Sequence, residues 1–293
     1  MEVWELIPRA LRRFRLPPAS LGRGISDPLV GFALGRSLLS LESSVPPLPL
    51  SGAGWSFSLC PEAGEGGGSF QSATRRVPEY VARGSARDPE RAAAEAARRA
   101  RGRLRRYCAA NRLNRLGTLT YAGEGCFDPL ELREHLSEFF RDLRTGLGGE
   151  ALPYVWVPEW HKSHGLHAHF AVGRYVNYRL IRELWGRGFV HIKLLGDLPV
   201  GSGKLSEARA AAGYLAKYVG KSFTESSARI LGHHRYDVAE GFQPEIFRLW
   251  GRSPEQVLAE ASVILDDDPV FEWSSSTVDD WEGPPAIWAQ WGR

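Results

Sequence analysis

An α+β fold is predicted for the middle of this 293-residue chain, where strand and helix patterns alternate in a regular order. Three observations support it: short runs of β-branched and aromatic residues, helically spaced apolar residues between these runs, and Asp-Pro or Asn caps before the helices. The order is strand, helix, strand, strand, helix, strand, and then one further helix. This split βαβ, ferredoxin-like order usually gives a four-stranded antiparallel sheet with both connecting helices on one face and the first and third strands in the centre.

Each element has a local pattern of its own. Asp88-Pro89, Asp128-Pro129 and Asn177 mark helix starts, and the glycines at 148–149 and 186 mark helix ends. The two middle strands lie close enough in sequence to form a hairpin. The predicted strands span 116–121, 154–160, 166–172 and 189–194, and the predicted helices span about 88–108, 128–147, 177–186 and 206–221.

Composition divides the chain into three regions. Residues 1–87 contain many prolines and glycines, so we expect them to be irregular and partly disordered. Residues 88–240 hold the predicted fold with a leading basic helix, and residues 241–293 form an acidic, tryptophan-rich tail. Eleven arginines face three acids between 83 and 115, whereas one arginine faces nine acids from 253 onward. Such asymmetry is typical of a polyanion-binding segment, or of a solvated helix together with a solubilising tail.

The same composition excludes several classes of protein. No stretch approaches roughly 18 consecutive apolar residues and the start lacks the apolar run of a secretory signal, so we expect a cytoplasmic protein without a membrane partner. The three cysteines are far apart and none belongs to a Cys-x-x-Cys pair. This spacing argues against a disulfide framework and against a cysteine zinc site.

A candidate metal site lies on the predicted hairpin. In the strand 166–172, His167 and His169 share one face, because side chains alternate along a strand. If the hairpin is centred on Ser163, Glu159 lies directly across from His167. Two imidazoles and a carboxylate suit Mn²⁺ or Mg²⁺ acting on a phosphate, and zinc or non-haem iron remains open. The alternative is that the histidines bond only to water or to neighbouring groups.

A second candidate site lies on the last predicted helix. Tyr214, Lys217, Tyr218 and Lys221 follow one another at helical spacing and share one stripe of the helix. A phenol has a pKa near 10, so it becomes a useful nucleophile when the attacked phosphate is polarised or when a base takes its proton. The alternative is an amphipathic helix end, with tyrosines packed on the sheet and lysines near the negative end of the helix dipole.

Together these motifs resemble those of a known family. Thr118–Thr120 on the first strand, Glu159 followed by His167–His169, and the Tyr-x-x-Lys-Tyr-x-x-Lys stretch 214–221 occur in the order of the three motifs of HUH endonucleases. Within that superfamily the chain most resembles rolling-circle replication initiators of single-stranded phages and actinobacterial plasmids. The resemblance covers about residues 110–237.

The resemblance implies an HUH core with the tyrosine-bearing helix on the metal face, and an enzyme that nicks and joins a single-stranded DNA origin. A tyrosine would attack the scissile phosphate and leave a 5′-phosphotyrosine and a free 3′-hydroxyl that primes synthesis. Carried over to this chain, the metal ligands would be Glu159, His167 and His169, the nucleophiles Tyr214 and Tyr218, and the phosphate-steadying cation Lys217.

Further partners follow from the basic residues and from a missing motif. Arg98, Arg101, Arg105 and Lys221 are expected to contact the DNA backbone, an interaction that weakens with salt. The loop 196–206 lacks the spacing of a phosphate-binding loop, so a host helicase and a host polymerase are expected to supply unwinding and synthesis.

Two other interpretations remain open from the sequence. The same chemistry serves transposases and conjugative relaxases, although a relaxase typically has its tyrosine ahead of the histidines. A ferredoxin-like sheet can also bind nucleic acid without catalysis by stacking bases on aromatic side chains. Tyr121 or Trp160 could stack a base in this way, or pack in the core.

Overall fold

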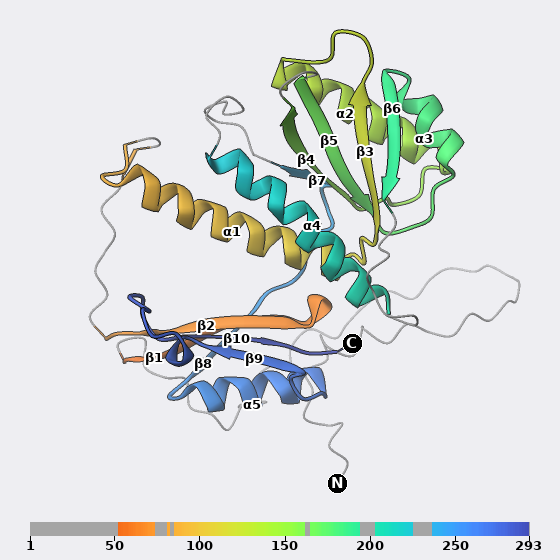
Figure 1. Cartoon of the computed structure of the whole chain (residues 1–293). Helices are drawn as coiled ribbons and strands as arrows, with labels where there is room; N and C mark the ends of the chain where they lie inside the picture. The colour runs from red at the N-terminus through yellow and green to blue at the C-terminus, as the bar shows by residue number, and fades with distance from the viewer. Residues whose placement is uncertain are drawn as a thin grey trace, which may run out of the picture. The chain divides into compact units, whose positions relative to one another are not determined.

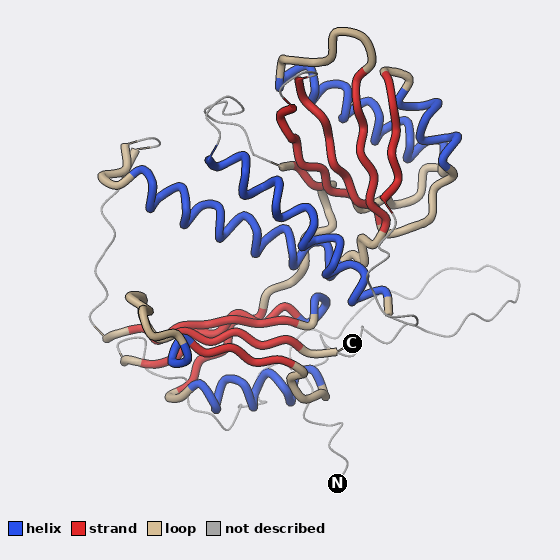
Figure 2. Tube along the Cα trace, viewed as in Figure 1, coloured by secondary structure: helices blue, strands red, loops and turns tan. Residues whose placement is uncertain are grey.

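The computed structural model describes residues 52–73, 81–82, 85–161, 165–193, 203–224 and 236–292. Within these ranges it is a mixed α+β structure with two antiparallel sheets and five α-helices (Figures 1 and 2). We call the sheet with strand order β6-β3-β5-β4-β7 the histidine sheet, and the sheet with order β8-β1-β2-β10-β9 the terminal sheet. Residues 1–51, most of the region expected to be irregular, lie outside the described residues.

The histidine sheet follows the order of elements that the sequence predicts, and β3 and β5 occupy its centre. Asp128 and Asn177 cap their helices as predicted, by accepting hydrogen bonds from the backbone N–H groups of Leu130 and Arg179. The elements of this part are α1 (Pro89–Ala110), β3 (Arg115–Tyr121), α2 (Pro129–Gly146), β4 (Tyr154–His161), β5 (Gly165–Val172), α3 (Tyr178–Trp185), β6 (Gly188–Lys193), α4 (Lys204–Thr224) and β7 (Asp237–Val238).

One face of the histidine sheet is apolar and packs against α2 and α3. Ala168, Phe170 and Val172 of β5 point to this face and are buried. They share a core with Phe139 of α2 and Trp185 of α3, and the Phe139 ring meets both aromatic neighbours edge to face. The two connecting helices therefore back the same side of the central strand, which leaves the other side for the histidines.

Helix α4 packs on that opposite face. Leu215 and Val219 of α4 belong to one core with Leu116, Val155 and Ala171, which form a row across β3, β5 and β4. Helix α1 contributes to the same core and packs along α4. The next row of the sheet carries the histidine site, so α4 is anchored beside that site by apolar packing.

The terminal sheet joins two segments that are far apart in the sequence. β1 pairs with both β2 and β8, and β10 pairs with both β2 and β9. Val257 and Ala261 of the helix that follows β8 pack into its core together with Phe57 and Trp291. The elements are β1 (Gly54–Cys60), η3 (Pro61–Ala63), β2 (Glu65–Gln71), β8 (Phe247–Gly251), α5 (Pro254–Leu265), β9 (Phe271–Ser274), η5 (Ser275–Thr277) and β10 (Ala286–Gln290).

This sheet differs from the sequence interpretation, in which residues 1–87 are irregular and residues 241–293 are a tail. The glycine run in β2 is the physical reason. A side chain at Gly66 would begin 2.3 Å from the Phe57 ring, and one at Gly68 would begin 2.2 Å from the Ser56 carbonyl oxygen. Glycine usually weakens a strand, but here it makes room for a large neighbour on β1.

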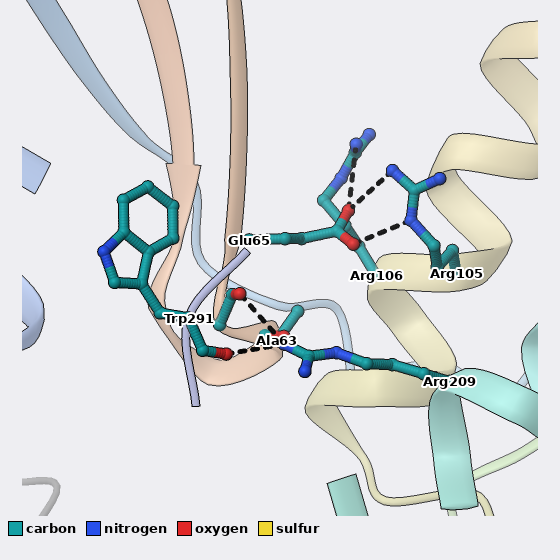
Figure 3. Close-up of polar contacts among 7 residues, drawn as sticks. Ala63, Glu65, Arg105, Arg106, Arg209 and Trp291 are labelled. Carbon is teal, nitrogen blue, oxygen red and sulfur yellow. Dashed lines mark hydrogen bonds and ion pairs between the residues drawn. The ribbon is translucent and has the colours of Figure 1, made fainter. Parts of the chain in front are cut away.

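Arginine side chains of α1 and α4 connect these helices to the terminal sheet through ion pairs and hydrogen bonds (Figure 3). Glu65, only 1% exposed, accepts two hydrogen bonds from Arg105, at 2.7 and 3.1 Å, and lies 3.8 Å from Arg106. Arg209 of α4 donates to the carbonyl oxygens of Ala63 and Trp291 at 3.0 and 2.8 Å. These contacts hold the terminal sheet, which is built from both ends of the described chain, against α1 and α4.

Substitution of Arg105 tests the strength of this connection. Within the described ranges, Arg105→Met leaves the buried Glu65 carboxylate with one ion-pair partner, the more distant Arg106. We therefore expect the free energy of unfolding to fall by about 1–3 kcal/mol in urea denaturation. The matched control is Arg141→Met, because the Arg141–Asp142 pair is 61% and 50% exposed; we expect a loss of at most about 0.5 kcal/mol. Equal losses in the two variants would contradict a stabilising role for the buried pair.

The cysteines provide a second test of the packing. Cys60, Cys108 and Cys126 are free and buried, and burial raises the pKa of the Cys60 thiol to about 11 and the pKa of the other two above the ordinary thiol value. Because a raised pKa favours the unreactive thiol, we expect no reaction of native protein with a thiol reagent at neutral pH, and faster reaction as the pH rises. All the cysteines should react in urea; rapid labelling of the native protein at neutral pH would contradict this packing.

Candidate active site

The register of the β4–β5 hairpin agrees with the sequence prediction. Glu159 pairs with His167, and Val157 pairs with His169. On the other side of β5, Thr118 of β3 pairs with His169 and Thr120 pairs with His167. Because side chains alternate along each strand, these two rows share one face of the histidine sheet. This is the face on which α4 packs.

His169 is fixed through both ring nitrogens. Its Nδ1 lies 2.9 Å from the Thr118 hydroxyl, and its Nε2 lies 2.8 Å from a carboxylate oxygen of Glu159. The residue is 5% exposed. An ionised carboxylate only accepts hydrogen bonds, so the ring donates from Nε2, and in the neutral ring Nδ1 accepts from Thr118. Thr118 and Glu159 thus orient the imidazole from two neighbouring strands.

His167 shares the face but differs in its surroundings. Its ring stacks on that of His161, the last residue of β4, with the ring centroids 5.3 Å apart. His161 pairs with Gly165 at the end of the hairpin next to the turn. Residues 162–164, which form the turn of this hairpin in the sequence, lie outside the described residues. Within the described ranges, no three histidine, cysteine, aspartate or glutamate side chains are already grouped to hold a metal ion.

The two tyrosines of α4 meet His169. The ring of Tyr218 stacks on the His169 ring with 3.8 Å between centroids, and the ring of Tyr214 meets it edge to face with 6.0 Å between centroids. The Tyr218 hydroxyl donates to the Tyr214 hydroxyl at 2.8 Å. Burial first, and then the hydrogen bond with Tyr214, raise the pKa of Tyr218 well above the ordinary phenol value. Tyr218 therefore keeps its proton at neutral pH and presents it to the oxygen of Tyr214.

Two lysines lie next to Tyr214. The ammonium of Lys217 is 5.9 Å from the centre of the Tyr214 ring, and that of Lys193 on β6 is 4.8 Å from it. Sequence reasoning identified Lys217 but missed Lys193. The alternation of Phe189, His191 and Lys193 along β6 could have revealed it, because it predicts all three on the face of Thr118 and Thr120.

The aromatic residues of the sheet separate into core and exposed positions. Tyr121 is 7% exposed and packs on Trp185, and Trp160 packs against the same core, which agrees with core packing for both. Phe189 is 69% exposed and pairs with Thr120 on the histidine face. The exposed aromatic beside the histidines is therefore on the edge strand β6.

The predicted DNA-binding residues lie on two helices, with the three arginines on α1 and the lysine on α4. Arg98 and Arg101 are exposed on α1, where Arg98 pairs with Glu95, and Arg105 is engaged with Glu65. The backbone of Lys221 belongs to α4, and its side chain lies outside the described residues.

Comparison with known proteins adds one finding. Residues 114–223 match the family model for the replication-associated protein ORF2 family. No curated protein and no solved structure matches the chain. The matched segment starts just before β3 and ends within α4, so it contains Glu159, both histidines and both tyrosines. The match supports a role in the initiation of replication.

Proposed function

We propose that the protein is a site-specific single-stranded DNA endonuclease and ligase that initiates rolling-circle replication, with the histidine sheet as a ferredoxin-like HUH core. The observation that carries the proposal is the contact chain from Glu159 through His169 to the phenols of Tyr218 and Tyr214. A carboxylate, an imidazole and two candidate nucleophiles come together there from three elements. The family match over 114–223 is consistent with this use of the site.

Glu159, His167 and His169 would hold a divalent metal ion. The donor set fits, because Glu159 and His169 already converge to 2.8 Å and His167 lies on the same face one pair along β5. Two nitrogens and a carboxylate oxygen suit Mn²⁺ or Mg²⁺. When bound, the ion would supply Lewis-acid polarisation of the scissile phosphate.

Tyr214 is the first nucleophile in this proposal. Tyr218 donates a hydrogen bond to its oxygen, which fixes the position of that oxygen. Lys193 and Lys217 add two positive charges beside the ring, which attract an approaching phosphate. Attack by Tyr214 forms a bond to phosphorus while the phenol gives its proton to solvent. The bond to the 3′ oxygen breaks, and that oxygen takes a proton from solvent and leaves as a hydroxyl.

Tyr218 would act in the second transfer. It lies one helical turn from Tyr214 and stacks on the same imidazole, so both phenols face the same place on the sheet. Attack of Tyr218 on a second copy of the site would form a second phosphotyrosine and break the bond to that 3′ oxygen. The 3′-hydroxyl released in this way attacks the Tyr214 phosphotyrosine, which restores a DNA linkage and frees the Tyr214 phenol without ATP, since the cleaved bond energy is kept in the adduct. Unwinding and strand synthesis are left to a host helicase and a host polymerase.

The covalent adduct is the direct test. Single-stranded oligonucleotides tiled across the DNA next to the gene are incubated with the full chain and Mn²⁺, and the products are separated on denaturing gels. We expect an adduct that disappears in EDTA and in the Tyr214→Phe, Tyr218→Phe double variant. Tyr214→Phe alone should abolish first cleavage, whereas Tyr218→Phe should keep the adduct and lose joining.

The matched control is Tyr175→Phe, because Tyr175 is 70% exposed in the loop between β5 and α3. It should leave the adduct unchanged. An adduct that persists in the double variant would rule out both tyrosines as nucleophiles. DNA binding without any adduct for the unsubstituted chain would instead favour a non-catalytic binding module.

Thr118 is a positioning residue, because it holds Nδ1 of His169 at 2.9 Å. Loss of such an orienting hydrogen bond typically costs about 10- to 100-fold in metal affinity or activity. We expect Thr118→Val to lower the nicking rate by that factor and to raise the Mn²⁺ concentration needed for half-maximal rate. Thr118→Ser keeps the hydroxyl and should restore both values. A Val variant with unchanged metal dependence would show that Thr118 only packs.

A further inference from the structure

A groove of about 1620 Å³ lies between α1 and the terminal sheet, away from the tyrosine site. One wall is the arginine-rich face of α1, and the others come from β2, β8, β10 and the segment 278–288. Gly67 and Gly68 of β2 contribute backbone to the lining, and the Trp288 side chain lies against Gly67. The arginines that line it are Arg91, Arg98, Arg99, Arg101, Arg103, Arg105, Arg106 and Arg248.

The groove has an excess of positive charge. Its eight arginines face only four acids, which are Glu95, Asp237, Asp280 and Glu282. Arg98 and Arg99 share Glu95, and Arg105 and Arg106 share Glu65. The remaining four arginines make no ion pair within the described part of the chain. A concave surface with this charge attracts a polyanion and concentrates it by its field.

Tryptophans face the arginines across this groove. Trp273, Trp281 and Trp288 all line it. Trp281 is 41% exposed, yet two contacts hold its ring in place. Its indole N–H donates to the Pro284 carbonyl at 3.0 Å, and its ring meets the Trp273 ring edge to face with 5.4 Å between centroids. Gly283 fits against the indole, where a side chain would begin 3.1 Å from the ring. An exposed aromatic held this firmly is a ready platform for a flat ligand.

We propose that this groove binds single-stranded DNA on the same molecule that carries the nuclease site. The arginines match a phosphate backbone, and exposed tryptophan rings stack on bases, which are accessible only when unpaired. The choice of DNA over other polyanions rests on the proposed function, because a nicking enzyme must hold the strand it cleaves. Helix α1 packs along α4, so the helix that lines the groove contacts the helix that carries the tyrosines.

Binding of a dye-labelled oligo(dT) of roughly 30 nucleotides, longer than the span covered by typical single-strand binding folds, tests the groove. Fluorescence anisotropy is measured with the full chain in EDTA, where no cleavage is expected. Trp281→Ala should weaken binding roughly 5- to 100-fold. The Arg101→Ala, Arg103→Ala double variant should reduce the slope of log affinity against log salt by about 0.7 for each arginine that touches a phosphate.

Controls come from outside the groove. Tyr175→Ala removes an exposed aromatic, and the Arg179→Ala, Arg182→Ala double variant removes two exposed arginines from α3; both should bind like the parent. Thermal unfolding checks that each variant is folded, and Trp281→Phe should recover most of the affinity because it keeps a ring. Unchanged affinity in the Trp281 and Arg101/Arg103 variants would overturn the proposal, as would tighter binding of duplex DNA or of oligo(U).

The same variants separate this proposal from the proposed function. If groove variants no longer bind oligo(dT) while the parent forms no covalent adduct, the result supports DNA binding in the groove and contradicts the nuclease assignment. If the parent forms the adduct and groove variants keep both affinity and adduct yield on long strands, the result supports the nuclease assignment and contradicts DNA binding in the groove.

Discussion

The two-residue repeat of β5 is the constraint on which the rest of this structure depends. Because alternate side chains point to opposite faces, Phe170 and Val172 build the core under α2 and α3 while His167 and His169 face α4. A shift of one residue in pairing would bury the imidazoles and expose the aromatic core. Packing and chemistry are therefore specified by the same register, and the apolar face stabilises the geometry of the polar one.

Much of the histidine sheet could be predicted because its information is local. Helix caps such as Asp128 and Asn177, the apolar periodicity of α2 and the short β4–β5 connection each depend on residues close in sequence. The hairpin centre alone places Glu159 opposite His167. The alternation on β6 that places Lys193 by Tyr214 is equally local, but a lone lysine on a strand carries neither the metal-ligand pattern nor the phenol pattern that marks the rest of the site.

The terminal sheet could not be predicted in this way. β1 pairs with β8, and β2 with β10, across gaps that no local pattern spans. The glycines of β2 have low strand propensity, and the close approach of the Phe57 ring to Gly66 and of the Ser56 carbonyl oxygen to Gly68 explains two of them. Side-chain rotamers in the site are likewise set by neighbours: stacking on His161 decides where the ring of His167 lies, and strand periodicity gives only its face.

Arg209 has a consequence for how this protein can be divided. Its half-buried guanidinium gathers carbonyl oxygens from Ala63, Gly64, Trp291 and Gly292, and burial lowers its pKa below the usual arginine value. A fragment limited to the family-matched segment would lack all four of these carbonyl acceptors. Arg209 would then have lost them on α4, the helix that carries both tyrosines. A shortened chain that is meant to preserve the tyrosine site should therefore keep both flanking segments or replace the guanidinium with an apolar group.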